Sequence, residues 1–224
     1  HVNSDGRVAS RLQAVDVDDD GLNDIVIHSR PNSGPFSPHA AINQGEGIFD
    51  PQSITPWDVP TLGQQPQMFA AIDVEGDGDQ DIVVSNASSD TVTVLVNHGL
   101  DGFTSGEPIA VGDLPYGIAT ADFDGDGDSD MAVANYTSGT VTLLLNDGDA
   151  VFEATTISGF DRPTTVLAGD LDGDGDFDLA VPNSNSGTIA ILLNDGHATF
   201  TPRNTINTGS RPYLGTLADL DADG

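Results

Sequence analysis

Residues 122–146 read DFDGDGDSDMAVANYTSGTVTLLLN, an acidic loop followed by a short apolar run, a polar turn and a β-branched run. The loop, residues 122–130, has Asp at every odd position and Gly at its sixth position. Short runs rich in Val, Leu and Thr, bounded by Gly and Asn, indicate strands and not helices. The stretch therefore predicts two antiparallel strands joined by a turn, with an acidic loop at the entry to the first.

The pattern repeats along the chain, with the first Asp of each loop at Asp16, Asp73, Asp122, Asp170 and Asp219, at spacings of 57, 49, 48 and 49 residues. In the complete repeats an Asn ends the β-branched run and a Phe follows six residues later. From the second repeat on, a Pro stands seven residues before the first Asp. Each unit then has four antiparallel strands. Units of this length are typical of propeller blades, and small residues such as Ala70 and Ala71 before the loop indicate the innermost strand.

The sequence thus predicts an all-β protein, a β-propeller of four-stranded antiparallel blades forming a single domain over residues 1–224. The expected repeats are residues 10–65, 66–114, 115–162 and 163–211, with part of a fifth at 212–224. Because the fifth loop stops at Gly224, we expect an incomplete propeller, a fragment of a larger one.

The composition excludes several classes of partner. The chain has 36 acidic and 6 basic residues, a formal charge of −30, and so should repel nucleic acid and anionic membranes. It has no Cys, and no apolar run long enough to cross a membrane. Of the 36 carboxylates, 23 lie in the five loops, and carboxylates gathered in this way need a cation.

The loops follow D-x-D-x-D-G-x-x-D, which suits Ca²⁺, a hard cation that takes six to eight oxygens. Positions 1, 3, 5 and 9 would bind through side chains and position 7 through its carbonyl. An EF-hand needs a Glu at position 12, where these loops have Ile or Val, and Mg²⁺ demands a tighter octahedron. We expect about four Ca²⁺ sites, with these ligands: Asp16, Asp18, Asp20, Leu22 and Asp24; Asp73, Glu75, Asp77, Asp79 and Asp81; Asp122, Asp124, Asp126, Asp128 and Asp130; Asp170, Asp172, Asp174, Asp176 and Asp178.

The stretch DFDGDGDSDMAVAN…TVTLLLNDGDAVF resembles the FG-GAP or VCBS repeat, seen in the integrin alpha-chain propeller and in many secreted bacterial proteins. The resemblance covers residues of about 10 to 224. It implies a propeller, commonly seven-bladed, with Ca²⁺ in the hairpin loops and roles in adhesion or carbohydrate binding. One departure is Glu75 at position 3 of the second loop, whose longer arm is expected to shift or weaken that site.

A ligand site is expected on the face opposite the acidic loops. The first repeat is eight residues longer than the second, and both insertions fall on that face. The candidate ligand-binding residues there are Arg30, Phe36, His39 and Trp57. The alternative for Trp57 is a buried position between blades. The repeated Arg162-Pro163 and Arg211-Pro212 are interpreted as turn residues, because the Pro recurs in every later repeat.

The functional expectation is a non-catalytic, extracellular module, secreted or at the cell surface, for adhesion or carbohydrate recognition. Its partners would be glycans or cell-surface proteins, with self-association through incomplete blades as a further possibility. Two alternatives stay open. One is an accessory propeller of a secreted polysaccharide-degrading enzyme, and the other is an architectural subunit of a surface layer or filament.

Overall fold

The computed structural model describes residues 8–18, 20–30, 37–46, 48–49, 55–56, 65–99, 102–213 and 215–218. For residues 8–13, 27–30, 37–40 and 55–56 the description covers the backbone alone. No helix in these ranges is long and apolar enough to cross a membrane.

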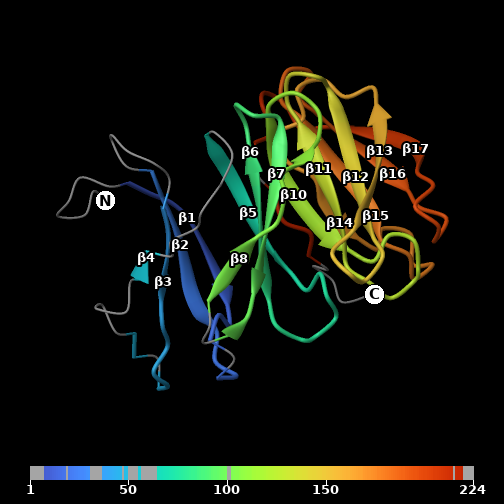
Figure 1. Ribbon diagram of the computed structural model, residues 1–224. Coiled ribbons are helices and arrows are strands. Elements are labelled where there is room, and N and C mark those ends of the chain that lie inside the picture. Colours follow the sequence, from blue (N-terminus) through green and yellow to red (C-terminus); the bar gives the residue numbers. More distant parts are fainter. Residues whose placement is uncertain are drawn as a thin grey trace.

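The described residues form four antiparallel sheets, three of four strands and one of five, each built from strands that are consecutive in sequence (Figure 1). The first sheet contains β1 (Val8–Val15), β2 (Asp24–Arg30), β3 (Ser37–Ala41) and β4 (Thr55–Pro56). The second contains β5 (Pro66–Ile72), β6 (Asp81–Asn86), β7 (Thr91–Asn97) and β8 (Phe103–Ser105), with β9 (Ile109–Ala110) also paired to β7. The third contains β10 (Pro115–Ala121), β11 (Asp130–Asn135), β12 (Thr140–Asn146) and β13 (Phe152–Ser158). The fourth contains β14 (Leu167–Gly169), β15 (Asp178–Asn183), β16 (Thr188–Leu193) and β17 (Thr201–Asn207). The predicted four-stranded blades are confirmed.

The second strand of each later sheet is buried along its whole length. Every residue of β6, β11 and β15 is buried. Alternate side chains of β11 enter different cores, as the period of two in a strand requires. Met131 and Val133 pack with residues of the second sheet, whereas Ala132 and Ala134 pack with residues of the fourth. The sheets therefore stack face to face, as propeller blades do.

The first strands of the sheets lie next to one another, β1 beside β5, β5 beside β10 and β10 beside β14. Their small residues permit this close approach: a Cβ added at Gly117 would lie 2.4 Å from Cα of Thr165. Across the second and third sheets, Oγ1 of Thr120 donates to the carbonyl of Ala71 at 3.3 Å. The predicted innermost strands are thus the ones that converge.

The antiparallel order separates the connections into two ends of the molecule. The acidic loops join first strands to second strands, and the Asn-x-Gly turns join third to fourth, so both lie at one end. Turns between second and third strands, and links between sheets, lie at the other. We call these the acidic end and the opposite end. The two insertions of the first repeat are predicted to lie at the opposite end, and residues 31–36 and 57–64 lie outside the described part of the chain.

Candidate metal sites

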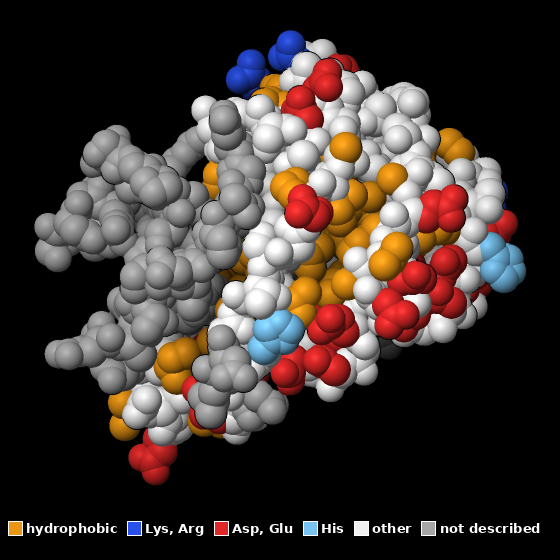
Figure 2. Space-filling model, in the orientation of Figure 1, with side chains coloured by type: hydrophobic (Ala, Val, Ile, Leu, Met, Phe, Trp, Pro, Cys, Tyr) orange, Lys and Arg blue, Asp and Glu red, His pale blue; other side chains and the backbone are white. Residues whose placement is uncertain are grey.

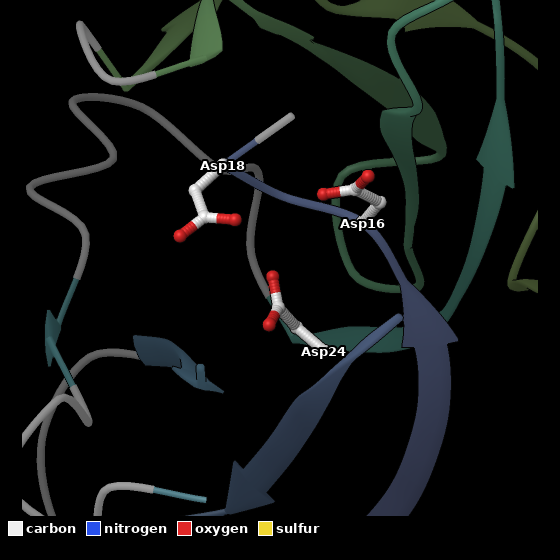
Figure 3. A group of neighbouring side chains, drawn as sticks. All are labelled: Asp16, Asp18 and Asp24. Carbon is white, nitrogen blue, oxygen red and sulfur yellow. The ribbon is translucent and has the colours of Figure 1, made fainter. Parts of the chain in front are cut away.

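Three acidic loops bring carboxylates from positions 1, 3 and 9 together, with one oxygen from each residue lying within 4.8 Å of the others. Figure 3 shows the first of these groups, in which the three side chains point into a common space. The groups are Asp16, Asp18 and Asp24; Asp122, Asp124 and Asp130; and Asp170, Asp172 and Asp178. A set of carboxylate oxygens without nitrogen or sulfur is the kind of site that Ca²⁺ prefers.

The carboxylate at position 9 is held in place by hydrogen bonds from two backbone amides. In the third sheet, Oδ2 of Asp130 accepts from the N–H of Phe123 at 2.8 Å, and Oδ1 accepts from the N–H of Asn146 at 2.8 Å. The equivalent bonds recur at Asp24, Asp81 and Asp178. All four side chains are buried. Position 9 therefore ties the loop to the end of the third strand, and its second lone pairs remain for a cation.

The carboxylate at position 1 holds the turn of the loop. In the second, third and fourth loops its oxygens accept from the N–H groups of positions 4 and 6, as Asp122 does from Gly125 at 2.8 Å and Gly127 at 3.1 Å. In the first loop Asp16 accepts from Gly21 at position 6. Gly127 has φ of +99°, a conformation that a side chain would strain. The Gly that the motif requires at position 6 thus serves the backbone and not the metal directly.

Position 5 is not part of these groups. Its carboxylate accepts from the N–H of position 7 instead, at 2.9 Å between Asp126 and Asp128 and 3.0 Å between Asp174 and Asp176. Asp20 and Asp77 make the same bond, to Leu22 and Asp79. The metal ligands predicted at position 5 (side chain) and position 7 (carbonyl) lie in the same loops as the groups. Their role as ligands stays a prediction.

The second loop differs from the other three. It keeps the same backbone bonds, with Asp73 accepting from Gly76 and Gly78, and Asp81 accepting from Val74. Among the described residues, however, Asp73, Glu75 and Asp81 do not form a group with oxygens within 4.8 Å, although all three residues are described. The extra methylene of Glu75 is the chemical difference at position 3. This agrees with the expectation that Glu75 shifts or weakens the site.

The carboxylates of the groups include side chains with raised pKa values. The pKa of the position 3 carboxyl is raised in all three groups, at Asp18, Asp124 and Asp172, first by loss of solvation and also by neighbouring carboxylates. Burial also raises the pKa of Asp81 and Asp130 to about 6, against the opposing effect of the two backbone amides. Negative charge is therefore disfavoured at these positions, whereas the backbone N–H of Gly173 lowers the pKa of Asp170 at position 1 of the fourth loop.

Two buried oxygens of the first loop, Oδ1 of Asp16 and Oδ1 of Asp18, have no hydrogen-bond partner among the described residues. Buried acceptors are normally satisfied, so orphaned oxygens within a group of carboxylates indicate a site that suits a cation. The residues of the three groups therefore fit Ca²⁺, which would satisfy these oxygens and offset the repulsion between them.

A contact between neighbouring sheets was missed by the sequence analysis. Nδ2 of Asn146 donates to the carbonyl of Val74 at 3.0 Å, and Nδ2 of Asn194 donates to the carbonyl of Phe123 at 2.8 Å. In each pair the acceptor is position 2 of the acidic loop in the preceding sheet. The Asn was recognised from its regular spacing only as a turn residue. Its second role is a contact between residues that are 72 positions apart in one pair and 71 in the other. The regular spacing within one repeat does not reveal such a contact.

The candidate ligand-binding residues are only partly placed. Phe36 and Trp57 lie outside the described residues, so the structure does not address the exposure of Trp57. Arg30 ends β2 and His39 lies in β3, where its backbone faces Ile27 and Pro56. His39 pairs within the middle of the first sheet, and the backbone alone does not show what its side chain contacts.

Four-stranded antiparallel sheets that carry an oxygen-lined acidic loop between their first two strands define a repeat protein of the β-propeller class. A model of the FG-GAP-like repeat matches residues 16–84, 73–133 and 122–181. These matches cover most of the sequence, and the chain belongs to the FG-GAP-like repeat family. No curated protein matches the chain in sequence.

Several solved structures are similar in fold. A functionally unknown protein from Desulfotomaculum acetoxidans has a TM-score of 0.58 and 18% identity, with 93% of this chain and 61% of that one covered. BBS1N, solved in complex with ARL6DN, has a TM-score of 0.53 and 13% identity, with 88% and 55% covered. An Agrocybe aegerita protein described as recognising non-reducing terminal N-acetylglucosamine has a TM-score of 0.49 and 18% identity, with 92% and 67% covered. The chain spans little more than half the length of the first two of these proteins.

Proposed function

We propose that this chain is a calcium-binding, non-catalytic module for extracellular adhesion or carbohydrate recognition. The observation that carries the calcium part is the set of three carboxylate groups, with orphaned oxygens on Asp16 and Asp18. Membership of the FG-GAP-like repeat family supports it. Sites of a few carboxylates on exposed loops bind Ca²⁺ weakly and fill where calcium is abundant, which is outside the cell.

The proposed role of Ca²⁺ is structural. Position 9 joins each loop to the end of the third strand, and the Asn at that end binds the loop of the preceding sheet in the third and fourth sheets. A cation held by positions 1, 3 and 9 would therefore stiffen the joints between blades as well as the loop itself. Its carboxylates would act as ligands and not as acid or base catalysts.

The recognition part rests on the opposite end of the molecule. Loops carried by a rigid scaffold commonly provide binding residues, and the sequence predicts that the extra length of the first repeat lies at that end. An aromatic ring such as that of Trp57 offers apolar contact to a sugar, whose hydroxyls need polar partners such as Arg30 or His39.

The calcium part is tested by titrating metal-depleted protein with Ca²⁺ in a calorimeter. We expect at least three sites, and the variant Asp124→Ala should lose one of them. A titration without heat, or a site count that Asp124→Ala leaves unchanged, would refute calcium binding at these groups.

The recognition part is tested on a glycan array with the calcium-loaded protein. Binding to one class of glycan is expected, Trp57→Ala should remove it, and Trp57→Phe should retain part of it. If Trp57→Ala instead lowers the melting temperature and leaves glycan binding intact, the ring is a packing residue. Absence of binding to any glycan would refute carbohydrate recognition.

A further inference from the structure

A polar pocket of about 200 Å³ lies at the opposite end of the molecule, between the third and fourth sheets and the segment that follows β17. It is lined by two arginines, two tyrosines and three small polar residues: Arg162, Arg211, Tyr136, Tyr213, Thr164, Ser184 and Asn185. None of these belongs to the acidic loops or to the candidate residues of the first repeat. Two of the six basic residues of the chain are thus in one pocket.

The turn itself does not require arginine at these positions. The residue before the recurring Pro has nearly the same left-handed conformation in each repeat, with φ of 55° at Gln65, 57° at Leu114, 55° at Arg162 and 55° at Arg211. Because Gln and Leu adopt it as well, the fold imposes the conformation whatever the side chain. The expectation that Arg-Pro is only a turn motif therefore explains the Pro but not the Arg.

The backbone beneath the pocket is firmly held. The carbonyl of Arg162 accepts from the N–H of Ser184 at 3.2 Å and from its hydroxyl at 2.9 Å. On the other side, Oγ1 of Thr164 donates to the carbonyl of Pro212 at 3.2 Å. Both Thr164 and Ser184 are buried. The two arginines are therefore carried on fixed turns that face a shared space.

The guanidinium groups are available to a ligand. Arg162 lies over the ring of Tyr136, with its Cζ 5.7 Å from the ring centroid, an arrangement that orients the group and leaves its N–H edge free. Within the described ranges, neither Arg162 nor Arg211 forms an ion pair with a carboxylate. The nearby carboxylate of Asp161 accepts from Nδ2 of Asn185 at 3.1 and 3.0 Å.

We propose that this pocket binds the carboxylate of an acidic sugar residue. Unpaired guanidinium groups match a carboxylate in a bidentate geometry. The half-exposed Tyr213 offers a ring face, and the side-chain oxygen of Asn185 can accept from a hydroxyl, a combination that favours a sugar over an acidic peptide. The volume is below the roughly 300–1,000 Å³ of sites that enclose drug-sized ligands, so a single sugar unit fits the pocket.

The carboxylate of Asp161 stands beside the pocket and is hydrogen-bonded to Asn185, whereas most acidic residues of the chain lie in the loops. Figure 2 shows a large group of acidic side chains along the lower edge of the molecule, whereas basic side chains lie at the top of the view with a few acidic side chains near them. The carboxylates of the loops lie far from the pocket, at the other end of each sheet, and bound Ca²⁺ would neutralise part of their charge. The proposal rests on the carbohydrate recognition proposed above and names the ligand class and the residues.

The test is ligand-observed NMR on calcium-saturated protein with methyl β-glucuronide and methyl β-galacturonide, each paired with its neutral glycoside. We expect saturation transfer to the uronides and much less to the neutral sugars. Arg162→Gln and Arg211→Gln should each weaken uronide binding roughly ten- to a hundredfold, the loss of a charge-assisted hydrogen bond. Gln65 occupies the same turn position, so both variants should fold, which the melting temperature checks. Arg203→Gln, on the exposed strand β17 and outside this pocket, is the matched control and should bind as the wild type does.

Three results would overturn the proposal. The first is no binding of either uronide, and the second is uronide binding that both Gln variants leave unchanged. The third is a preference for a neutral glycoside, or binding only of a short Asp- and Glu-containing peptide tested in parallel. Glycan binding that depends on Trp57 but not on these arginines would reject the pocket and leave the proposed function standing.

Discussion

Aspartates of one loop have different functions according to how deeply each side chain is buried. Asp130 is fully buried, and its carboxylate accepts hydrogen bonds from two backbone N–H groups. Asp126 is exposed, and its carboxylate accepts a hydrogen bond from the N–H of Asp128 in the same loop. The sequence presents the two as equal members of D-x-D-x-D-G-x-x-D. The structure indicates that position 9 holds the fold even without metal, while position 5 acts locally.

Replacing Asp130 by Asn should therefore destabilise the metal-free protein. The amide has only one acceptor oxygen, so either the N–H of Phe123 or that of Asn146 would face an NH₂ group and lose its partner. Leaving a buried donor unsatisfied costs about 1–3 kcal/mol. Asp126→Asn keeps an oxygen for Asp128 and should change stability by less than about 0.5 kcal/mol. Urea unfolding in excess chelator measures both, and equal stability of the two variants would contradict this division.

The buried carboxyls also predict a pH dependence. Burial raises the pKa of Asp81 and Asp130 to about 6 in the folded chain, from 3.8. The folded state then binds protons more tightly than the unfolded state. The contribution of these groups to stability is therefore fully present below about pH 4 and is lost as the pH rises through about 6.

Metal-free protein should accordingly unfold at higher urea at about pH 5 than at about pH 7. Asp130→Asn should show a smaller difference between the two pH values, which separates this carboxyl from the general relief of charge repulsion. Calcium should reverse the trend, because protons compete with the cation for the same oxygens. A metal-free midpoint that rises with pH over this range would show that the carboxyls are not shifted upward.

Between elements, the loop of one sheet is joined to the third strand of the next by a side-chain amide. Asn194, just after β16, donates to the carbonyl of Phe123 at 2.8 Å and to that of Phe177 at 3.2 Å, so it binds loops of two sheets. Asn97 holds the equivalent place in the second sheet, and its Nδ2 donates to Gln80 of its own loop at 3.3 Å. The side chain of Asn194 thus links two sheets, whereas the side chain of Asn97 bonds within its own sheet.

Asn194→Ala should destabilise the chain by about 1–3 kcal/mol, because it removes buried bonds within and between sheets. The carbonyl of Phe123 would keep the N–H of Ala198, which limits the loss. Asn97→Ala, the matched control, should cost less, and it should leave the third and fourth sheets unaffected. Urea unfolding in chelator gives the stabilities, and hydrogen exchange at Ala198 reports the joint. Faster exchange at Ala198 in Asn97→Ala than in Asn194→Ala would contradict the assignment.

For the whole molecule, the repeat length, the strand order and the metal loops could be predicted because they depend on local spacing. Turn residues, β-branched runs and the six-residue interval from Asn146 to Phe152 each act within one blade. Contacts between blades could not be predicted in this way. The bond from Asn146 to Val74 and the shared pocket of Arg162 and Arg211 both depend on how one sheet is set against the next.

Calcium should stabilise the whole chain and not only the loops. A ligand at about 100 times its dissociation constant adds roughly 2.7 kcal/mol per site when the unfolded chain does not bind it. Three such sites would add about 8 kcal/mol, comparable with the total stability of an ordinary domain of about 5–15 kcal/mol. Excess chelator should therefore lower the melting temperature sharply, and restored Ca²⁺ should recover it.

Two variants test whether the stabilisation by Ca²⁺ comes from the acidic loops. Asp126→Ala should lower the melting temperature in Ca²⁺ mildly, because its carboxylate lies outside the group formed by Asp122, Asp124 and Asp130. Glu75→Asp should raise it, because the second loop would gain the side chain that the other three loops have at position 3. In chelator both variants should melt close to the wild type, since neither side chain is buried. A wild-type melting curve that is the same in chelator and in Ca²⁺ would show that the fold does not depend on these sites.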